Sequence, residues 1–289
     1  MDSFSYQDSA HPFFPTGSKD AQGNSLLYTY DSPGNLISVK NVTTGGAGET
    51  TSYSYNSDGT LHTMTDGNGH QTSYSYDSVG NLVKVTPPGP LGATTIKPDN
   101  LSRASSVTDG KGQTTSYTYD ALDRITKITY ASGSTITYTR DVAGNVTSLT
   151  DNTGTTSFTY DAANRLLTKK LPGGVTLSMT YDSVGNLTSF TDQGGKVSYS
   201  YNAVNLLTTL TEPGGASTTF SYDPNNRRTA TAYPNSVKLS LTYDNAGNET
   251  AITGKNAGGT PLSGYSYTYG GTHMRQSMTG NSTAISTTA

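Results

Sequence analysis

Alternating side chains mark most of this chain as β-strand. Segments such as "TSYSYD" (72–77) and "TSFTYD" (156–161) place an aromatic residue at every second position. Successive side chains of a strand point to opposite faces, so Tyr74 and Tyr76 share one face. Downstream segments such as "LTSFT" instead place apolar residues three apart, as in Leu187 and Phe190. This spacing predicts either a β-bulge after a turn or a strand that is buried on both faces.

The strands belong to a repeat of about 21 residues. The stretch "YDSVGNL" occurs at residues 76–82 and again at 181–187. Equivalent segments begin at eleven positions, and after a first interval of 25 residues every interval is 20 to 22 residues: Tyr30, Tyr55, Tyr76, Pro98, Tyr119, Arg140, Tyr160, Tyr181, Tyr201, Tyr222 and Tyr243. We call the residue that begins each copy the anchor. A period this steady indicates a single repeat domain, which we place at residues 26–270.

Each copy of the repeat contains a turn signal. Asp or Asn follows the anchor, and its side chain can accept a backbone hydrogen bond two residues on. Three residues later comes Gly, Asn or Asp in all copies except one, and these residues tolerate a positive φ. In the two identical copies the predicted structural turn residues are Asp77, Gly80 and Asn81, and Asp182, Gly185 and Asn186. A second turn closes each repeat, as in "TDGNGH" (65–70), so that one repeat makes two strands.

The fold predicted from this repeat is all-β. Eleven copies give about 22 short antiparallel strands arranged as consecutive β-hairpins, with essentially no helix. The composition agrees, because 32 Gly and 21 Tyr suit turns and strands, whereas hydrophobic residues are only 31% and charged residues 13%. Open twisted sheets rarely exceed about ten strands without curling. We therefore expect a curved, spiralling sheet that forms a hollow shell or a superhelix.

Both ends of the chain depart from the repeat. Residues 1–25 contain Phe4, Phe13 and Phe14, half of all Phe in the chain, and we expect an irregular N-terminal cap or plug there. Residues 271–289 predict a polar C-terminal tail. The first residues, "MDSFSYQDSAHPFFPTG", lack the basic start and apolar middle of a signal peptide. An export signal is therefore expected to lie outside this chain or to be of another kind.

Charge and composition narrow the classes of partner. The net charge is −3 and no Lys/Arg cluster occurs, so we expect no nucleic-acid partner. No apolar run is long enough to span a bilayer, so no membrane insertion is predicted. Cysteine is absent, which excludes disulfides and thiolate metal sites. No dinucleotide, phosphate-loop or zinc-protease motif is present, and we predict no cofactor.

The tyrosines are the first candidate binding residues. A β-surface lined with Tyr, Thr and Ser can stack on sugar rings. The candidate ligand-binding residues for a glycan are Tyr74, Tyr76, Tyr117, Tyr119, Tyr199 and Tyr201. The alternative is that tyrosines of neighbouring strands pack against one another as cross-strand aromatic pairs. The regular period favours packing over binding.

Histidines and turn aspartates give two further candidate sites. His62 and His70 flank one hairpin turn and could face each other across the strand ladder. They would then provide a general base with Tyr53 or Tyr74 nearby, as a polysaccharide lyase or hydrolase needs, although exposed histidines beside a turn are the simpler interpretation. Turn aspartates beside Gly and Asn could also bind Ca²⁺, namely Asp66, Asp109, Asp151 and Asp192. Each turn supplies only one or two carboxylates, so we predict no metal site.

The pattern "YDxxGNL" or "YDxxxRL", repeated about every 21 residues, resembles the RHS/YD-repeat family. The resemblance covers roughly residues 26–270 and implies a β-sheet spiral. In bacterial toxin complexes and polymorphic toxins the spiral forms a hollow shell around a toxic C-terminal part, and in teneurins it forms an adhesion module at the cell surface. It therefore implies a structural module of a secreted or cell-surface bacterial protein that encloses a polypeptide or displays a partner.

The same resemblance bears on catalysis. Toxin members of the family carry, beyond their repeats, an RHS core segment with acidic residues that cleaves the chain. That segment would begin at "YGGTHMRQSMTG" (269–280), where this chain instead runs into a Ser/Thr-rich stretch. Self-cleavage is therefore not predicted, and a non-enzymatic role is favoured.

Overall fold

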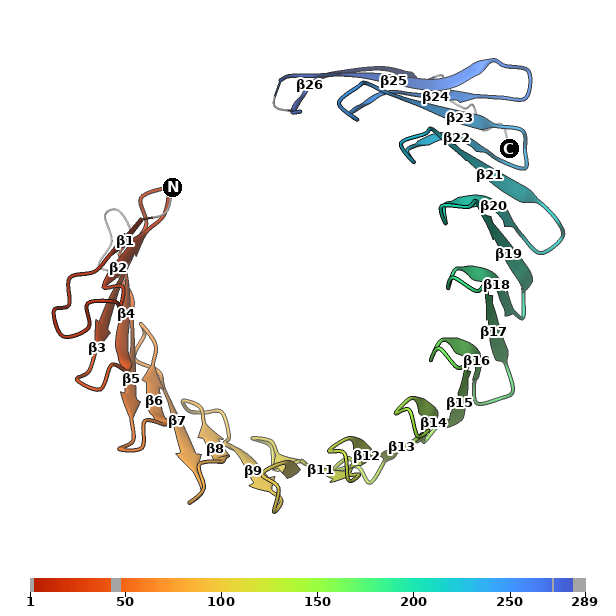
Figure 1. The fold of residues 1–289 in the computed structure, drawn as a ribbon. Helices are drawn as coiled ribbons and strands as arrows, with labels where there is room; N and C mark the ends of the chain where they lie inside the picture. Colours follow the sequence, from red (N-terminus) through yellow and green to blue (C-terminus); the bar gives the residue numbers. More distant parts are fainter. Residues whose placement is uncertain (1–2, 43–47, 272, 283–289) are drawn as a thin grey trace. The chain divides into compact units, whose positions relative to one another are not determined.

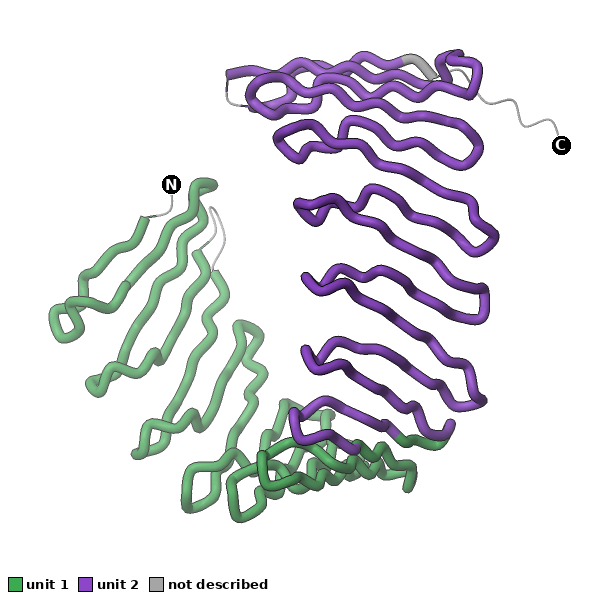
Figure 2. Tube along the Cα trace, turned by 45° about the vertical axis from the view of Figure 1, so that its right-hand side comes forward, with its two compact units in different colours: residues 1–138, 150–152 green, residues 139–149, 153–289 purple. Residues whose placement is uncertain are grey.

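The computed structural model describes residues 3–42, 48–271 and 273–282. The regular secondary structure of these residues is all β-strand, and 26 strands follow one another along the chain (Figure 1). Two compact units divide the chain, residues 1–138 with 150–152 and residues 139–149 with 153–289 (Figure 2). The boundary passes through β13 (Thr135–Arg140) and β14 (Val146–Asp151). In the described residues no helix exists that could cross a membrane.

The first unit is an antiparallel sheet in which each strand pairs with its neighbours in the chain. Its strands are β1 (Ser3–Ser5), β2 (Gly17–Lys19), β3 (Ser25–Tyr30), β4 (Leu36–Val42), β5 (Thr50–Tyr55), β6 (Leu61–Thr65), β7 (Gln71–Tyr76), β8 (Leu82–Thr86), β9 (Thr94–Pro98), β10 (Ala104–Thr108), β11 (Thr114–Tyr119) and β12 (Ile125–Thr129).

The second unit has the same architecture of consecutive antiparallel hairpins. Its strands are β15 (Gly154–Tyr160), β16 (Leu166–Lys170), β17 (Thr176–Tyr181), β18 (Leu187–Asp192), β19 (Gly195–Tyr201), β20 (Leu207–Thr211), β21 (Ser217–Tyr222), β22 (Arg228–Ala232), β23 (Lys238–Tyr243), β24 (Glu249–Lys255), β25 (Pro261–Tyr269) and β26 (Arg275–Ser282). The eleven predicted repeats account for β3 to β24, which are the 22 strands expected from the sequence.

A β-bulge follows the first turn of each repeat. Between β17 and β18, Thr180 pairs with Ser189 but Tyr181 pairs with Leu187, so one residue of β18 has no partner across the ladder. Met179 pairs with Phe190 in the same register. Leu187 and Phe190 therefore lie on one face although they are three residues apart. The bulge interpretation of the apolar spacing is confirmed.

The first turn at residues 77–81 and the second turn at residues 66–70 have the same backbone. In the first turn the Asp77 N–H donates to the Asn81 carbonyl at 2.9 Å and the Gly80 N–H donates to the Asp77 carbonyl at 3.1 Å. In the second, Asp66, Gly69 and His70 form the same two bonds at 3.0 Å each. Gly80 has φ of 87° and Gly69 has φ of 83°, the left-handed region that Gly occupies without cost. Both are type I turns that end in a bulge, which suits a three-residue hairpin loop.

The sheet is a single layer without a core of its own. Each strand contacts only the strands that flank it in the ladder, as far as the described residues show. Among these residues no apolar side chain is buried, and Ser189 and Thr231 are the only buried polar side chains. One face of the sheet carries the Tyr, Leu, Ile and Val side chains, and we call this face the tyrosine face. The other carries Ser, Thr and Lys, for example Ser75 opposite Lys84.

The ends of the chain are more regular than the sequence predicts. Residues 1–25 were expected to be irregular, but they contain β1 and β2, which extend the sheet beyond β3. Within the predicted polar tail 271–289, β26 pairs with β25, and residues 283–289 lie outside the described residues. Tyr269 pairs with Arg275 across the same register shift that places Tyr181 opposite Leu187. β25 and β26 therefore form a twelfth repeat, with His273 at the left-handed position, where φ is 60°.

Candidate functional site

The anchor tyrosines connect each repeat to the preceding one. The Tyr181 hydroxyl donates to the Leu166 carbonyl at 3.0 Å, and the Tyr201 hydroxyl donates to the Leu187 carbonyl at 3.0 Å. In each case the acceptor lies six residues after the preceding anchor. The same bond is made by Tyr55, Tyr119, Tyr160, Tyr222, Tyr243 and Tyr269. These hydroxyls therefore stabilise the stack of repeats.

Arginine side chains form a second connection between repeats at the same edge of the sheet. Arg165 donates through Nε to the Asp161 Oδ2 at 2.7 Å, and its guanidinium lies 4.7 Å from the ring centroid of Tyr181. Its Nη1 also donates to the Asp182 carbonyl at 3.1 Å. One side chain thus joins the carboxylate of its own turn to the ring and backbone of the next repeat. The same arrangement recurs at Arg103 with Asp99 and Tyr119, and at Arg227 with Asp223 and Tyr243.

Asparagine replaces arginine in other copies. The Asn186 Nδ2 donates to the Asp182 Oδ2 at 2.8 Å and to the Asn205 Oδ1 of the next turn at 2.9 Å. The hydrogen bond from the Asn186 side chain lowers the pKa of Asp182, and backbone N–H donors add to the effect against a smaller opposing effect of burial. Asn81 lowers the pKa of Asp77 in the same way. The turn residues named from the sequence therefore form a bonded unit, and their contacts are structural.

The tyrosines proposed for a glycan all lie on the tyrosine face, and each is half-buried. They do not pair with one another as the packing interpretation expected. Tyr74 lies opposite Val85, Tyr117 opposite Ile128, and Tyr199 opposite Leu210. The anchors Tyr76, Tyr119 and Tyr201 lie opposite Leu82, Ile125 and Leu207. Aromatic rings thus pack across the ladder against aliphatic side chains, because the strand after each bulge supplies Leu, Ile or Val.

The histidines proposed as a general base are not brought together. The register pairs Thr63 with Ser73 and places His70 inside the turn, where its N–H and ring Nδ1 bond Asp66. His62 is exposed on β6 and cannot face His70 across this ladder. Tyr53 lies opposite Met64, on the tyrosine face with Tyr74. The facing pair expected from the sequence is therefore not formed.

The turn aspartates proposed for Ca²⁺ are spread along the sheet. Asp66 bonds His70, and the Asp192 Oδ1 accepts the Gly194 N–H at 2.8 Å. Asp109 and Asp151 belong to other turns. Within the described part of the chain no group of three or more His, Cys, Asp or Glu side chains could hold a metal ion. The arrangement does not provide the several oxygen ligands that Ca²⁺ needs.

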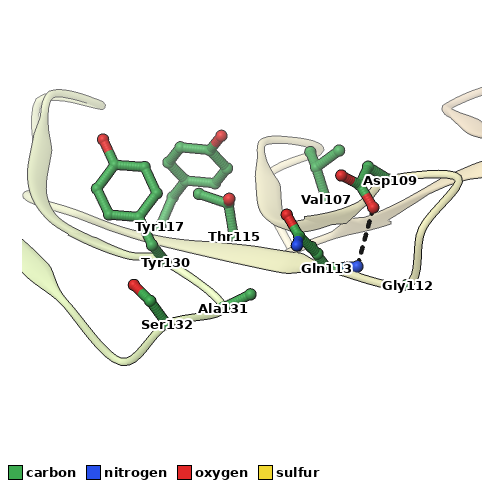
Figure 3. A pocket seen from close by; sticks show the side chains of 9 residues that line it. All are labelled: Val107, Asp109, Gly112, Gln113, Thr115, Tyr117, Tyr130, Ala131 and Ser132. Atoms are coloured by element: carbon green, nitrogen blue, oxygen red, sulfur yellow. Dashed lines mark hydrogen bonds between the residues drawn. The ribbon is translucent and has the colours of Figure 1, made fainter.

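One hollow on the first unit has a lining suited to a ligand (Figure 3). Its volume is about 690 Å³, and it lies over β10, β11 and the turn after β12. The side chains of Tyr117 and Tyr130 stand side by side at one end, with Thr115 next to them, and Asp109 and Gln113 lie at the other end (Figure 3). Further lining residues are Val107, Gly112, Ala131 and Ser132.

Tyr117 and Asp109 were predicted to have other roles, glycan binding and Ca²⁺ binding, and this hollow was not predicted from the sequence. Tyr130 was the available signal, because it stands at the first position of a second turn, where Asp109 stands one repeat earlier. A Tyr at this position cannot act as the turn acceptor that Asp provides. This departure from the repeat lies at one end of the hollow.

Comparison with known proteins agrees with this architecture. The family model described as RHS Repeat matches residues 55–90, 99–135 and 126–156, and the model described as Teneurin YD-shell matches residues 155–256. Among curated proteins, none matches the chain. The crystal structure of TcdB2-TccC3 resembles it with a TM-score of 0.58 at 15% identity, over 98% of this chain and 18% of that chain. The structure of TcdB2-TccC3-TEV gives a TM-score of 0.56 at 15% identity, over 97% of this chain and 18% of that chain.

These findings define the class of protein: it is a repeat protein built from consecutive β-hairpins, and its fold resembles that of toxin-complex shells. The two family models together cover residues 55–90 and 99–256. The chain belongs to the RHS/YD-repeat family. It spans less than a fifth of the length of the toxin-complex chains that it resembles.

Proposed function

We propose that this chain is a structural segment of a secreted or cell-surface bacterial shell, and that its tyrosine face encloses a polypeptide. The observation that carries the proposal is a single-layer sheet with one apolar face and no element packed on that face within the described residues. A sheet with an apolar face is stable only when that face is covered. The partner that covers it is therefore part of the function.

The accessible surface measures how much remains to be covered. The chain exposes 18278 Å², whereas a compact globular protein of 30.3 kDa exposes about 12,000 Å². This difference of about 6,000 Å² includes polar and apolar surface on both faces of the sheet, because a single layer leaves both faces open to solvent. An enclosed polypeptide would cover the tyrosine face, and the likeness in fold to toxin-complex shells supports this role.

The chemistry of the tyrosine face suits a polypeptide without fixed structure. Tyr, Thr and Leu side chains offer broad apolar contact together with hydroxyl groups, and lysines such as Lys84 and Lys127 lie on the opposite face. Such a face can contact many sequences through apolar surface and scattered hydrogen bonds. A low density of charge also avoids strong pairing with any one segment.

Side-chain footprinting tests this proposal. The chain is mixed with a reduced and alkylated model polypeptide that cannot refold, and hydroxyl-radical labelling of tyrosines and methylation of lysines are compared with the free chain. We expect protection of Tyr74, Tyr117 and Tyr199, with Lys84 and Lys127 labelled as before. Protection of the lysines instead, or no protection of these tyrosines, would contradict an enclosing role for the tyrosine face.

A glycan-binding surface stays the alternative hypothesis, with less support. The anchors Tyr119 and Tyr201 already use their hydroxyls in bonds to the backbone of the preceding repeat. Their capacity to donate to sugar hydroxyls is thereby reduced. A polysaccharide that protects the same tyrosines, while the unfolded polypeptide does not, would favour this alternative.

A further inference from the structure

One turn aspartate differs from all others that open a turn of the same type. Eleven of these aspartates bond the side chain four residues on through Oδ2, namely Asp20, Asp31, Asp66, Asp77, Asp99, Asp120, Asp141, Asp161, Asp182, Asp223 and Asp244. Asp109 uses only Oδ1, which accepts the N–H groups of Lys111 and Gln113 at 2.9 Å each. In the part of the chain that the structure describes, no side chain bonds the Asp109 Oδ2.

In these eleven turns the group that bonds Oδ2 is an asparagine amide in six, an arginine guanidinium in four and a histidine ring in one. In four turns it is an arginine, and its guanidinium bonds the turn carboxylate: Arg103, Arg124, Arg165 and Arg227. In three of them the guanidinium also lies 4.5 to 4.7 Å from the centroid of a tyrosine ring. The Asp109 turn has Gln113 instead of arginine, and it faces the hollow that contains Tyr117 and Tyr130. Among the described residues, the Asp109 carboxylate has no such cation beside it, and the two rings lie at the other end of the hollow (Figure 3).

The hollow has the charge and length for a long cationic side chain. Asp109 is the only charged residue in its lining, so it disfavours phosphate, sulfate or carboxylate groups. Gln113 and Tyr117 are four residues apart on β11 and the turn before it, which is about 13 Å at the rise of a strand. Val107 lies opposite Thr115 between them and provides a partly apolar floor. Tyr130, 40% exposed, leaves its ring accessible at the far end.

We propose that this hollow binds an arginine side chain of an extended polypeptide segment. The guanidinium bonds the Asp109 Oδ2 and the Gln113 side-chain oxygen, its aliphatic stem lies over Val107 and Thr115, and the neighbouring residue packs on Tyr117 and Tyr130. The inference rests on the proposed function, because the polypeptide is the one that the tyrosine face encloses. Arginine is preferred over lysine because its planar fork donates to two oxygens at once.

The test uses the whole chain and two short peptides followed by NMR. One peptide, acetylated and amidated, contains a single arginine beside a leucine; the other has citrulline, a neutral isostere, in its place. We expect the arginine peptide to shift the resonances of Gln113, Thr115 and Tyr117, with a dissociation constant on the order of 1 mM. The citrulline peptide should bind about fivefold more weakly, the change that one exposed ion pair produces.

Three variants decide whether the hollow is the site. Gln113→Arg restores the arrangement of Arg103 and Asp99 within the chain, so it should abolish binding of the arginine peptide without removing any lining ring. Tyr130→Ala should weaken binding. Tyr233→Ala is the matched control, because Tyr233 also opens a second turn and is 39% exposed, and it should leave binding unchanged.

Several outcomes would overturn the proposal. Equal binding of the citrulline peptide, no effect of Gln113→Arg, or tighter binding of a neutral oligosaccharide such as maltohexaose at the same residues would each do so. The proposed function fails separately. If Tyr74 and Tyr199 are protected by the unfolded polypeptide but Gln113→Arg has no effect on the peptide, the shell role stands and the arginine site does not. If the arginine peptide binds as expected while the tyrosine face is unprotected, only the enclosing role fails.

Discussion

The Tyr181 hydroxyl donates a hydrogen bond of 3.0 Å to the Leu166 carbonyl oxygen, which belongs to the preceding repeat. Leu166 is the residue at which β16 begins, so the bond joins β17 to the start of the strand beside it. In repeat proteins each unit is stabilised mainly by its neighbours. A bond of this kind at successive repeats therefore stabilises the interface between repeats and explains why the anchor is so often Tyr.

The first prediction concerns this bond. Tyr181→Phe removes the hydroxyl and leaves the Leu166 carbonyl without that donor, so we expect a loss of about 1 kcal/mol in the free energy of unfolding. Tyr76→Phe is the matched control, because the described residues offer the Tyr76 hydroxyl no hydrogen-bond partner and its ring packs against Leu82 in the same way. Urea unfolding measures both variants. Equal effects of the two substitutions would show that the hydroxyl bond does not stabilise the repeats.

The second prediction concerns the arginine connection. Arg227 bonds the Asp223 carboxylate at 2.7 Å, lies 4.6 Å from the ring centroid of Tyr243 and donates to the Asp244 carbonyl at 3.2 Å. Arg227→Lys keeps the charge but loses the planar fork, so it cannot make the three contacts together. We expect a lower midpoint of thermal unfolding. Arg228→Lys, at the exposed neighbouring position, should leave the midpoint unchanged, and a shift of equal size there would contradict this interpretation.

The turn and strand pattern could be predicted because its causes are local. Asp77 and Gly80 specify a turn through a side-chain acceptor and a left-handed backbone, and both are visible in the sequence. The 22 strands of the eleven repeats follow from the same signals. The bulge could only be stated as one of two alternatives, because the spacing of Leu187 and Phe190 fits both until the register is known.

The connections between repeats could not be predicted, because they depend on side chains brought together from different repeats. Leu166 and Arg165 lie 15 and 16 residues before Tyr181, and no local pattern in the sequence identifies them as its partners. The hollow was missed for the same reason. Asp109 is recognised as different only when its hydrogen bonds are compared with those of the other turn aspartates, which accept a side-chain bond at Oδ2.

The third prediction concerns the left-handed turn position. Gly185 has φ of 103°, and a Cβ added there would lie 3.7 Å from the nearest atom, Arg165 Nη1, which is an ordinary contact. The cost of Gly185→Ala therefore comes from the backbone conformation and should be about 1–2 kcal/mol in the free energy of unfolding. Asn226→Gly, at the equivalent position two repeats later, where φ is 63°, should be tolerated. Chemical denaturation of both variants checks the difference.

The fourth prediction concerns acid. Side-chain and backbone hydrogen bonds hold the pKa of Asp77 below its ordinary value of 3.8, and Asp182 behaves in the same way. A carboxylate whose pKa is lowered by folding contributes stability above its unfolded value and loses it as the pH falls through the folded value. We expect stability to decline from about pH 4 downward. The double variant Asp77→Asn with Asp182→Asn should show a smaller decline in the free energy of unfolding below about pH 4. An unchanged decline would show that these two carboxylates do not cause it.

The last prediction concerns the N-terminal segment, which we propose acts as a cap on the first repeat. His11 stacks on Phe14 with centroids 5.3 Å apart, Phe14 lies 5.1 Å from the Tyr30 ring, and His11 Nδ1 is 2.8 Å from the Asp8 carboxylate. The hydrogen bond with Asp8 raises the pKa of His11 above 6.5, and the bond with His11 lowers that of Asp8.

A histidine whose pKa is raised by folding contributes stability that is complete below its unfolded value and is lost as the pH rises through the folded value. Amide hydrogen exchange of the segment 8–14 should therefore accelerate from about pH 6.5 upward. The acceleration should exceed the rise that base catalysis of exchange alone produces. Asp8→Asn keeps an acceptor for the Ala10 N–H but removes the charge, so it should lower the pKa of His11 and abolish the extra acceleration. Asp20→Asn, in the next turn, should leave the titration of His11 unchanged. If Asp8→Asn does not change the pKa of His11, the ion pair with Asp8 is not the cause of the acceleration.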